Sequence, residues 1–281
     1  MGKNKIKNTF IQKRPIFYTL SATTGFFFLL TIKEINPHFT IFAICALVIY
    51  GLVLTEVIST YKYASDKLKR LEIIHTTSEV IRTYFYYYLL ITSILYVSTA
   101  LFLYFQINTV ISVLTICVFT ATYYYILKHI RAVFDRNIEA ELLSDTILDA
   151  SIIAIFFISM SATLELSLRL SNNSQLTAVA GIFFSMLFLL LNTIKKQKVS
   201  VPSILYILII SLALGGIMYM TMNLQKDAAP ITNSFLWTMF FYLLSAIYYH
   251  AIEGTLRFTI IIEYLVIAGV VFFLYLNVVQ R

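Results

Sequence analysis

Residues 128–150, KHIRAVFDRNIEAELLSDTILDA, are a polar island between two long apolar runs, 109–127 and 148–166. The same alternation extends over the whole chain of 281 residues, of which 59% are hydrophobic and only 12% are charged. A soluble domain carries about twice that charged fraction. The apolar runs are long enough to cross the roughly 30 Å hydrocarbon core as helices. We therefore expect an all-α polytopic membrane protein, integral to a bacterial cell membrane.

The polar island also carries a concentration of acidic residues. On a helix, Glu141, Asp145 and Asp149 are four residues apart and form one column of carboxylates, with Asp135 and Glu139 as a second pair to the side. Such a column could hold a metal ion or a basic headgroup. It could equally be a solvated face whose acids are neutralised by cations of the same segment, which are Lys128, Arg131 and Arg136.

Nine apolar runs predict nine transmembrane helices in a single domain of residues 1–281. Proline fits the first turn of a helix, and all four prolines fall at or just before the start of a run. Gly215 and Gly216 lie inside the seventh run, where they predict a kink or a close neighbour. No GxxxG motif marks a dimer face, so the oligomeric state stays open. The predicted spans are 15–32, 37–59, 83–105, 109–127, 148–166, 176–194, 202–222, 233–249 and 256–279.

The distribution of Lys and Arg predicts a cytoplasmic amino end. With that end inside, seventeen of the 21 cations fall in cytoplasmic segments, as membrane proteins generally arrange them. Topology thus explains the net charge of +7, and no nucleic-acid partner is expected. Of the cytoplasmic segments, 60–82 has the spacing of an amphipathic helix lying on the membrane, where its cations face membrane lipids. Segment 128–147 is predicted to be a charged loop.

Three tyrosine clusters, 84–88, 123–125 and 248–249, map to the cytoplasmic interface. Tyrosines collect where a membrane meets water, so the simple interpretation is an aromatic belt. Alternatively, some rings, Tyr123 among them, line a pocket that opens toward the cytoplasm and stack on a flat or cationic ligand.

Charged residues within spans are costly in a bilayer and are therefore functional candidates. Glu263 lies several residues into the ninth run, and we expect it to be buried against another helix. Glu56 lies near the inner end of the second. The spacing of Glu165 and Arg169 predicts a local ion pair. Motifs of metalloproteases, serine hydrolases and nucleotide-binding proteins are absent from the sequence, so no cofactor is expected.

Two stretches of the sequence carry a family resemblance. One is Lys13-Arg14-Pro15, which enters the first span and leads to Thr19 and Gly25, and the other is the end of the sixth span, LFLLLNTIKKQK. With nine spans and a cytoplasmic amino end, the chain resembles the UbiA-type intramembrane prenyltransferases over its whole length. That resemblance implies Asp-rich motifs in the inner loops after the second and sixth spans, which hold magnesium and a prenyl diphosphate.

The chain departs from the family at those motifs. The first loop offers only Asp66, with Glu56 nearby, and the second, residues 192–198, has no acid. Diphosphate chemistry needs Mg²⁺ on hard oxygen ligands, so we expect no magnesium-dependent prenyl transfer. The lysines of the second loop could still bind an anionic head directly.

Three functions are consistent with the sequence. The first is a degenerate UbiA-like scaffold that binds a lipid, isoprenoid or other hydrophobic molecule with an anionic head at the cytoplasmic side. The second is a transporter, permease subunit or self-protection protein, with Glu56, Glu263 and the glycine pair along a pathway. The third is an active enzyme with Mg²⁺ on Glu141, Asp145 and Asp149. The candidate ligand-binding residues are Glu56, Asp66, Tyr123, Asn192, Lys195, Lys196 and Glu263.

Overall fold

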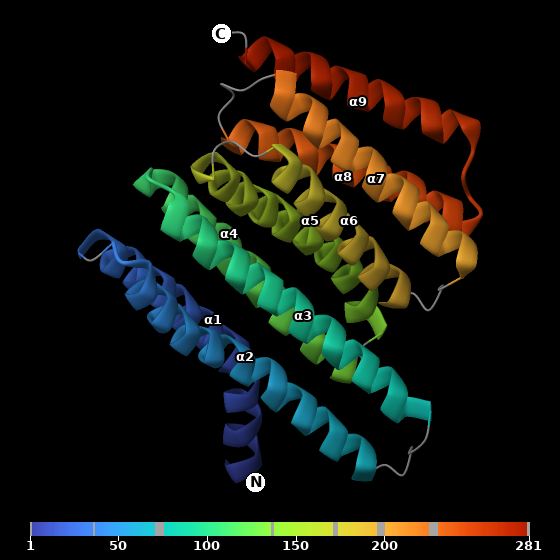
Figure 1. Ribbon diagram of the computed structural model, residues 1–281. Helices are drawn as coiled ribbons and strands as arrows, with labels where there is room; N and C mark the ends of the chain where they lie inside the picture. The colour runs from blue at the N-terminus through green and yellow to red at the C-terminus, as the bar shows by residue number, and fades with distance from the viewer. Residues whose placement is uncertain are drawn as a thin grey trace. The chain divides into compact units, whose positions relative to one another are not determined.

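Nine helices account for nearly all of the described chain (Figure 1). The computed structural model describes the backbone of residues 2–35, 37–70, 76–135, 138–170, 174–195, 200–224 and 230–279. Side chains are described for fewer residues; among those left out are 2–13, 60–85 and 131–148. The helices are α1 (Gly2–Ile35), α2 (Phe39–Arg70), α3 (Thr76–Phe105), α4 (Thr109–Asp135), α5 (Ile138–Arg169), α6 (Ser174–Lys195), α7 (Val201–Leu224), α8 (Pro230–Glu253) and α9 (Phe258–Val279).

The all-α polytopic membrane fold is confirmed. Eight of these helices contain a segment long and apolar enough to cross a membrane, among the residues that the structure describes. The ninth, α9, is apolar over Phe258–Phe273, the stretch in which its side chains are continuously described, and this stretch is shorter than a full span. Each apolar segment begins and ends within a few residues of a predicted span, because apolar length sets where a helix crosses the bilayer.

The helices extend beyond the predicted spans at the expected inner side. α2 continues to Arg70 and α3 begins at Thr76, so segment 60–82 divides between two helix ends and is not a separate surface helix. Likewise α4 continues to Asp135 and α5 begins at Ile138. The expected charged loop 128–147 is therefore mostly helical. Glu141, Asp145 and Asp149 share α5, whereas Asp135 belongs to α4 and Glu139 to α5.

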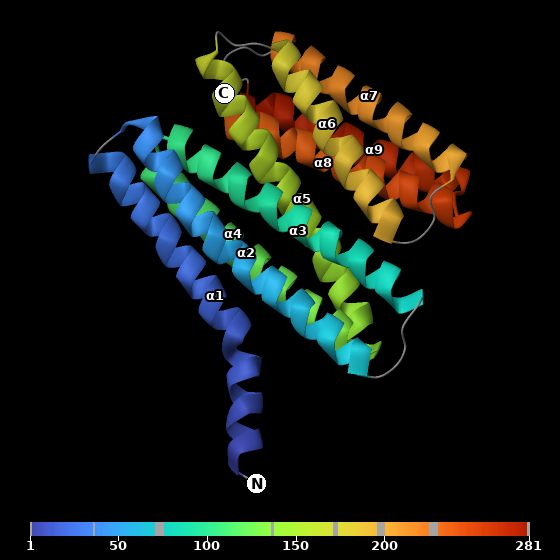
Figure 2. The same ribbon diagram turned by 60° about the horizontal axis from the view of Figure 1, so that its bottom comes forward.

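Pro15 lies inside a helix and not at its start, because α1 begins at Gly2. A proline within a helix removes one backbone hydrogen bond and disturbs the preceding turn. Figure 2 shows that α1 changes direction part way along its length. The apolar segment of α1 begins close to this residue, at Arg14. Pro15 therefore marks the start of the span, as predicted, without marking the start of the helix.

The chain divides into two compact units. Unit 1 is Met1–Ile155 and contains α1 to α4 with the first part of α5; unit 2 is Phe156–Arg281. Composition does not reveal this division, because both units consist of long, mostly apolar helices. Within each unit, consecutive helices joined by short connections pack as neighbours.

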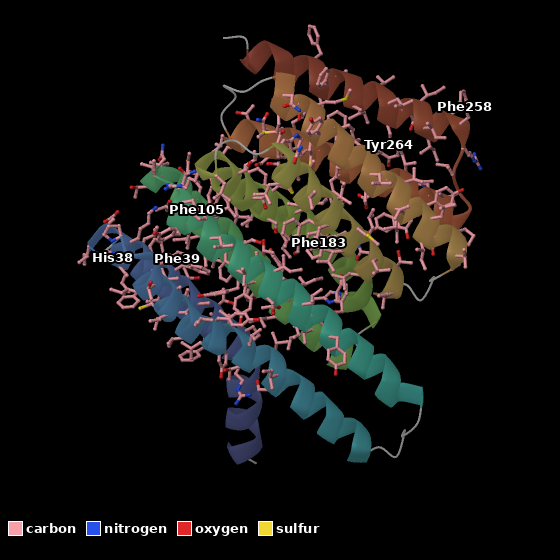
Figure 3. The ribbon with its side chains drawn as sticks, in the orientation of Figure 1. His38, Phe39, Phe105, Phe183, Phe258 and Tyr264 are labelled. Atoms are coloured by element: carbon pink, nitrogen blue, oxygen red, sulfur yellow. The ribbon has the colours of Figure 1, made fainter. Side chains whose placement is uncertain are left out.

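In unit 1, α1 packs against α2 and α4, and α3 packs against the same two helices. The ring of Phe26 on α1 lies 4.4 Å from that of Phe119 on α4 and 5.1 Å from that of Tyr96 on α3, measured between ring centroids. At the end of the unit where α1 meets α2, Phe39 contacts Tyr104, whose hydroxyl donates to the carbonyl of Pro37 over 3.0 Å. Figure 3 shows Phe39 and Phe105 at this end.

In unit 2, α6 and α7 approach closely through glycine. A Cβ atom added to Gly215 on α7 would lie 2.3 Å from Ile182 Cγ1 on α6. α7 is nevertheless one continuous helix, so the glycine pair admits a close neighbour and does not break the helix. Trp237 on α8 is fully buried and donates its indole N–H to Thr221 Oγ1 on α7 over 2.9 Å. Residue Gly254, with φ of 70°, ends α8 and allows the turn into α9.

Candidate functional site

Glu56 is the most completely buried carboxylate among the residues whose side chains are described, with 0% of its surface exposed. α2 carries it on the same side as Val53 and Val57, which face the interior of unit 1. Residue 59 follows at the next turn, and its hydroxyl, Ser59 Oγ, donates to Glu56 Oε2 over 3.1 Å. The charge that the sequence placed near the inner end of the second span thus lies inside the helical bundle and not at its lipid-facing surface.

Tyr123 of α4 lies near Glu56. Its side chain is fully buried, and its hydroxyl donates to the carbonyl of Val53 over 2.8 Å, one turn before Glu56 on α2. Tyr123 interacts electrostatically with both Glu56 and Tyr18 of α1. Two helices, α2 and α4, therefore contribute oxygen-bearing side chains near Glu56, and Tyr18 of α1 lies near Tyr123. Glu56 and Tyr123, two of the sequence candidates, are brought together.

A second polar pair lies in unit 1, between α3 and α4. The hydroxyl of Tyr88 hydrogen-bonds Nδ1 of His129, and both side chains are buried. His129 comes six residues after Tyr123 on α4, about 9 Å further along the helix axis. His129 was not among the sequence candidates. The sequence feature that could have identified it is its position at the end of an apolar run, beside a tyrosine cluster.

The tyrosine clusters are not simple belts. Tyr88, Tyr123 and Tyr248 are buried, whereas Tyr86 and Tyr125 in the same clusters are exposed. Successive residues on a helix point about 100° apart, so a run of tyrosines supplies both the interior and the surface. Only the outward rings are placed as a belt requires.

In unit 2, the ends of α6 and α8 are joined by two neighbouring hydrogen bonds. Asn192 donates its side-chain amide to the hydroxyl of Tyr249, and Thr193 hydrogen-bonds the hydroxyl of Tyr248. We call these four residues the polar clamp. Asn192 and Thr193 are both buried. The sequence candidate Asn192 therefore has a defined partner on another helix, one turn before Lys195, the last residue of α6.

Glu263 does not lie as predicted. Its side chain is exposed on α9. α9 packs against α8 alone among the described helix pairs with substantial contact, so much of its surface is left open. The prediction rested on the cost of an unpaired carboxylate near the bilayer interior, and it is wrong for the single chain.

The remaining candidates are less well placed. The structure describes no side-chain surroundings for Asp66 on α2, for Glu141 and Asp145 on α5, or for Lys195, and Lys196 lies outside the described residues. Asp149 is partly exposed on α5. Within the described part of the chain, no three His, Cys, Asp or Glu side chains gather as a metal site would require. The prediction of an ion pair between Glu165 and Arg169 remains a prediction.

No protein-family model matches the chain, and no curated protein or solved structure matches it significantly. The resemblance to the UbiA-type prenyltransferases therefore rests on the sequence features alone. The function has to be inferred from the chemistry of the polar residues within each unit.

Proposed function

We propose that this integral membrane protein binds a lipid or isoprenoid with an anionic head, and that the head lies beside the polar clamp. The observation that carries the proposal is the pair of hydrogen bonds from Asn192 and Thr193 to two adjacent tyrosines of α8. These bonds hold the end of α6, with Lys195 one turn further and Lys196 after it. A lysine ammonium group can bind a phosphate or carboxylate oxygen through a charge-assisted hydrogen bond.

The same helix offers a surface for the tail. Val179, Phe183 and Met186 recur at helical spacing on α6, and each is exposed. Figure 3 labels Phe183 on this helix. An acyl or prenyl chain lying along this stripe would extend from the lysines toward the other end of α6. A headgroup at the cationic end and a tail along an apolar helix face are the arrangement that an amphipathic ligand needs.

The transporter interpretation has less support. Gly215 is occupied by packing against α6, α7 runs unbroken through both glycines, and Glu263 is exposed on α9. Transporter sites are commonly built from discontinuous helices, and the described part of α7 is not one. Of the three features of the predicted pathway, the glycine pair and Glu263 are therefore not placed to form it, and only Glu56 remains.

Native mass spectrometry of the purified protein tests the lipid proposal. We expect adducts with the mass of an anionic lipid or isoprenoid, and a lower bound fraction in the double variant Lys195→Gln/Lys196→Gln. The matched control is Lys67→Gln/Lys69→Gln, which removes the same charge from the other long inner segment. Equal binding by both variants, or no retained lipid in the unmodified protein, would refute the proposal.

The enzyme interpretation has its own assay. The purified protein is incubated with Mg²⁺, prenyl diphosphates and a panel of aromatic acceptors, and we expect no turnover. Turnover that disappears in Asp145→Asn/Asp149→Asn would favour the third function over the first.

A further inference from the structure

Glu263 is an exposed carboxylate on an otherwise apolar helix. It comes five residues after Phe258, the first residue of α9, and so lies about 7–8 Å along the helix. Val266, Val270 and Phe273 continue the same face, and each is exposed. A charged side chain that faces lipid is costly, and membrane proteins place such residues against an opposite charge or a polar group. Glu263 therefore indicates that a surface with a cation covers this face of α9.

α8 occupies a different side of α9. The ring centroid of Tyr264 lies 6.3 Å from that of His250 on α8, and the hydroxyl of Tyr275 hydrogen-bonds the side-chain oxygen of Asn233, also on α8. This packing leaves the face with Glu263 open in the single chain. A covering surface has to come from elsewhere.

A matching cation lies on α4 of unit 1. Lys128 is exposed, and it comes two residues before Ile130, where the apolar segment of α4 ends. α4 ends after four crossings and α9 begins after eight, so Lys128 and Glu263 lie near the same membrane surface. Their depths differ by about 4–5 Å, which the flexible stem of lysine can span. Within the described part of the chain, neither side chain forms a hydrogen bond or an ion pair.

The two faces also match in spacing. Four exposed residues of α9, beginning at Glu263, are separated by three, four and three residues, and four exposed residues of α4, counted back from Lys128, have the same separations. α4 runs toward this membrane surface and α9 runs away from it, so the two helices are antiparallel. In that arrangement the facing positions are Glu263 with Lys128, Val266 with Tyr125, Val270 with Ala121, and Phe273 with Val118.

We propose that this protein self-associates through these two faces: the open face of α9 in one copy packs against the exposed face of α4 in a second copy, and Glu263 pairs with Lys128 of that second copy. The opposite charges fix the register of the two helices. The residues that follow supply van der Waals contact, and the small Ala121 allows a close approach. The lipid proposal concerns α6, so either proposal can fail while the other stands.

Disulfide cross-linking between two copies of the full chain tests the proposal. Both copies carry Cys45→Ala/Cys117→Ala, which removes the natural cysteines. One copy, with one affinity tag, also carries Tyr125→Cys, and the other, with a different tag, carries Val266→Cys. They are co-expressed, and the membranes are oxidised with copper phenanthroline. We expect a linked product that contains both tags, which only a contact between copies can give.

The control replaces Val266→Cys by Ile209→Cys. Ile209 is exposed and lies eight residues into α7, just as Val266 lies eight residues into α9. We expect several-fold less linked product with this control, because α7 offers no charge that matches Lys128.

A charge exchange tests the ion pair. Glu263→Lys in the copy with Val266→Cys should lower the linked product several-fold, and Lys128→Glu in the other copy should restore it. Restoration by the second change shows that the first one did not act by unfolding the protein.

Three results would overturn the proposal. The first is a yield no higher than that of the Ile209 control, and the second is a charge exchange without loss and restoration. The third is a link that forms only when Tyr125→Cys and Val266→Cys are on one chain, which would mean that α9 is covered within the same molecule.

Discussion

Lys33 shows how a single cation near the membrane surface is held by this fold. Its ammonium group donates to the carbonyl of Leu103 over 2.8 Å and also to the carbonyl of Gln106. Leu103 lies in the last turn of α3 and Gln106 directly follows the helix, where backbone acceptors lack partners within the helix and the helix dipole is negative. One side chain of α1 therefore caps another helix.

We predict that Lys33→Met lowers the free energy of unfolding by about 1–3 kcal/mol, because hydrogen bonds from a charged donor to two carbonyls are lost. Thermal unfolding followed by circular dichroism measures the change. Lys128→Met is the control, since Lys128 is exposed on α4 and its removal should have little effect. Equal loss in both variants would contradict the capping role.

Individual side chains were only partly predictable from the sequence. Glu56 and Tyr123 were selected because ionisable and aromatic residues near membrane boundaries are unusual enough to notice. Their proximity was not predictable, since it depends on how α2 and α4 pack. The partners of Lys33 are backbone carbonyls about seventy residues away in sequence. Residue types carry no information about such partners. The exposure of Glu263 was missed because it too depends on how the helices pack.

Among the helices, the contact of α6 with α7 depends on small residues at matching positions. Gly181 and Ser185 are buried on α6, and Ser211 and Gly215 are buried on α7. Each pair is four residues apart, so it lies on one helix face. Small side chains allow helix backbones in a membrane to approach closely, which gains van der Waals contact that larger residues would prevent.

We predict that Gly215→Ala destabilises the protein by about 1–3 kcal/mol, the usual cost of overpacking. The added Cβ would lie 2.3 Å from Ile182 Cγ1 and 3.2 Å from the carbonyl of Ala178, and neither a β-branched stem nor a backbone atom moves easily. Gly216→Ala provides a control one residue away, because its Cβ would meet no atom within 4 Å. There we expect no loss, and up to about 1 kcal/mol of gain from helix propensity.

The helices themselves were the most predictable part of the structure. Apolar length fixes where a chain can cross a bilayer, so the spans were found within a few residues. The extensions of α2 to Arg70 and of α4 to Asp135 were missed, since polar sequence beyond the membrane does not by itself distinguish a loop from a continuing helix. The contact of α6 with α7 carries no GxxxG motif, because each helix supplies one glycine and one serine.

For the whole molecule, nine predicted crossings place the two termini on opposite sides of the membrane. We predict a cytoplasmic amino end, based on the excess of Lys and Arg in the inner segments. Reporter fusions after residues 70, 136 and 198 should give a cytoplasmic signal, and fusions after residues 107 and 172 an external one. A reversed pattern, or two termini on one side, would refute the predicted topology.

Trp237 gives unit 2 an optical property that unit 1 does not share. It is the only tryptophan in the sequence, and it is fully buried with its indole N–H bonded to Thr221. Its fluorescence emission therefore reports the packing of α7 and α8 alone. A red shift of that emission on heating marks the loss of unit 2. Any ellipticity lost at a different temperature belongs to helices that the fluorophore does not sense.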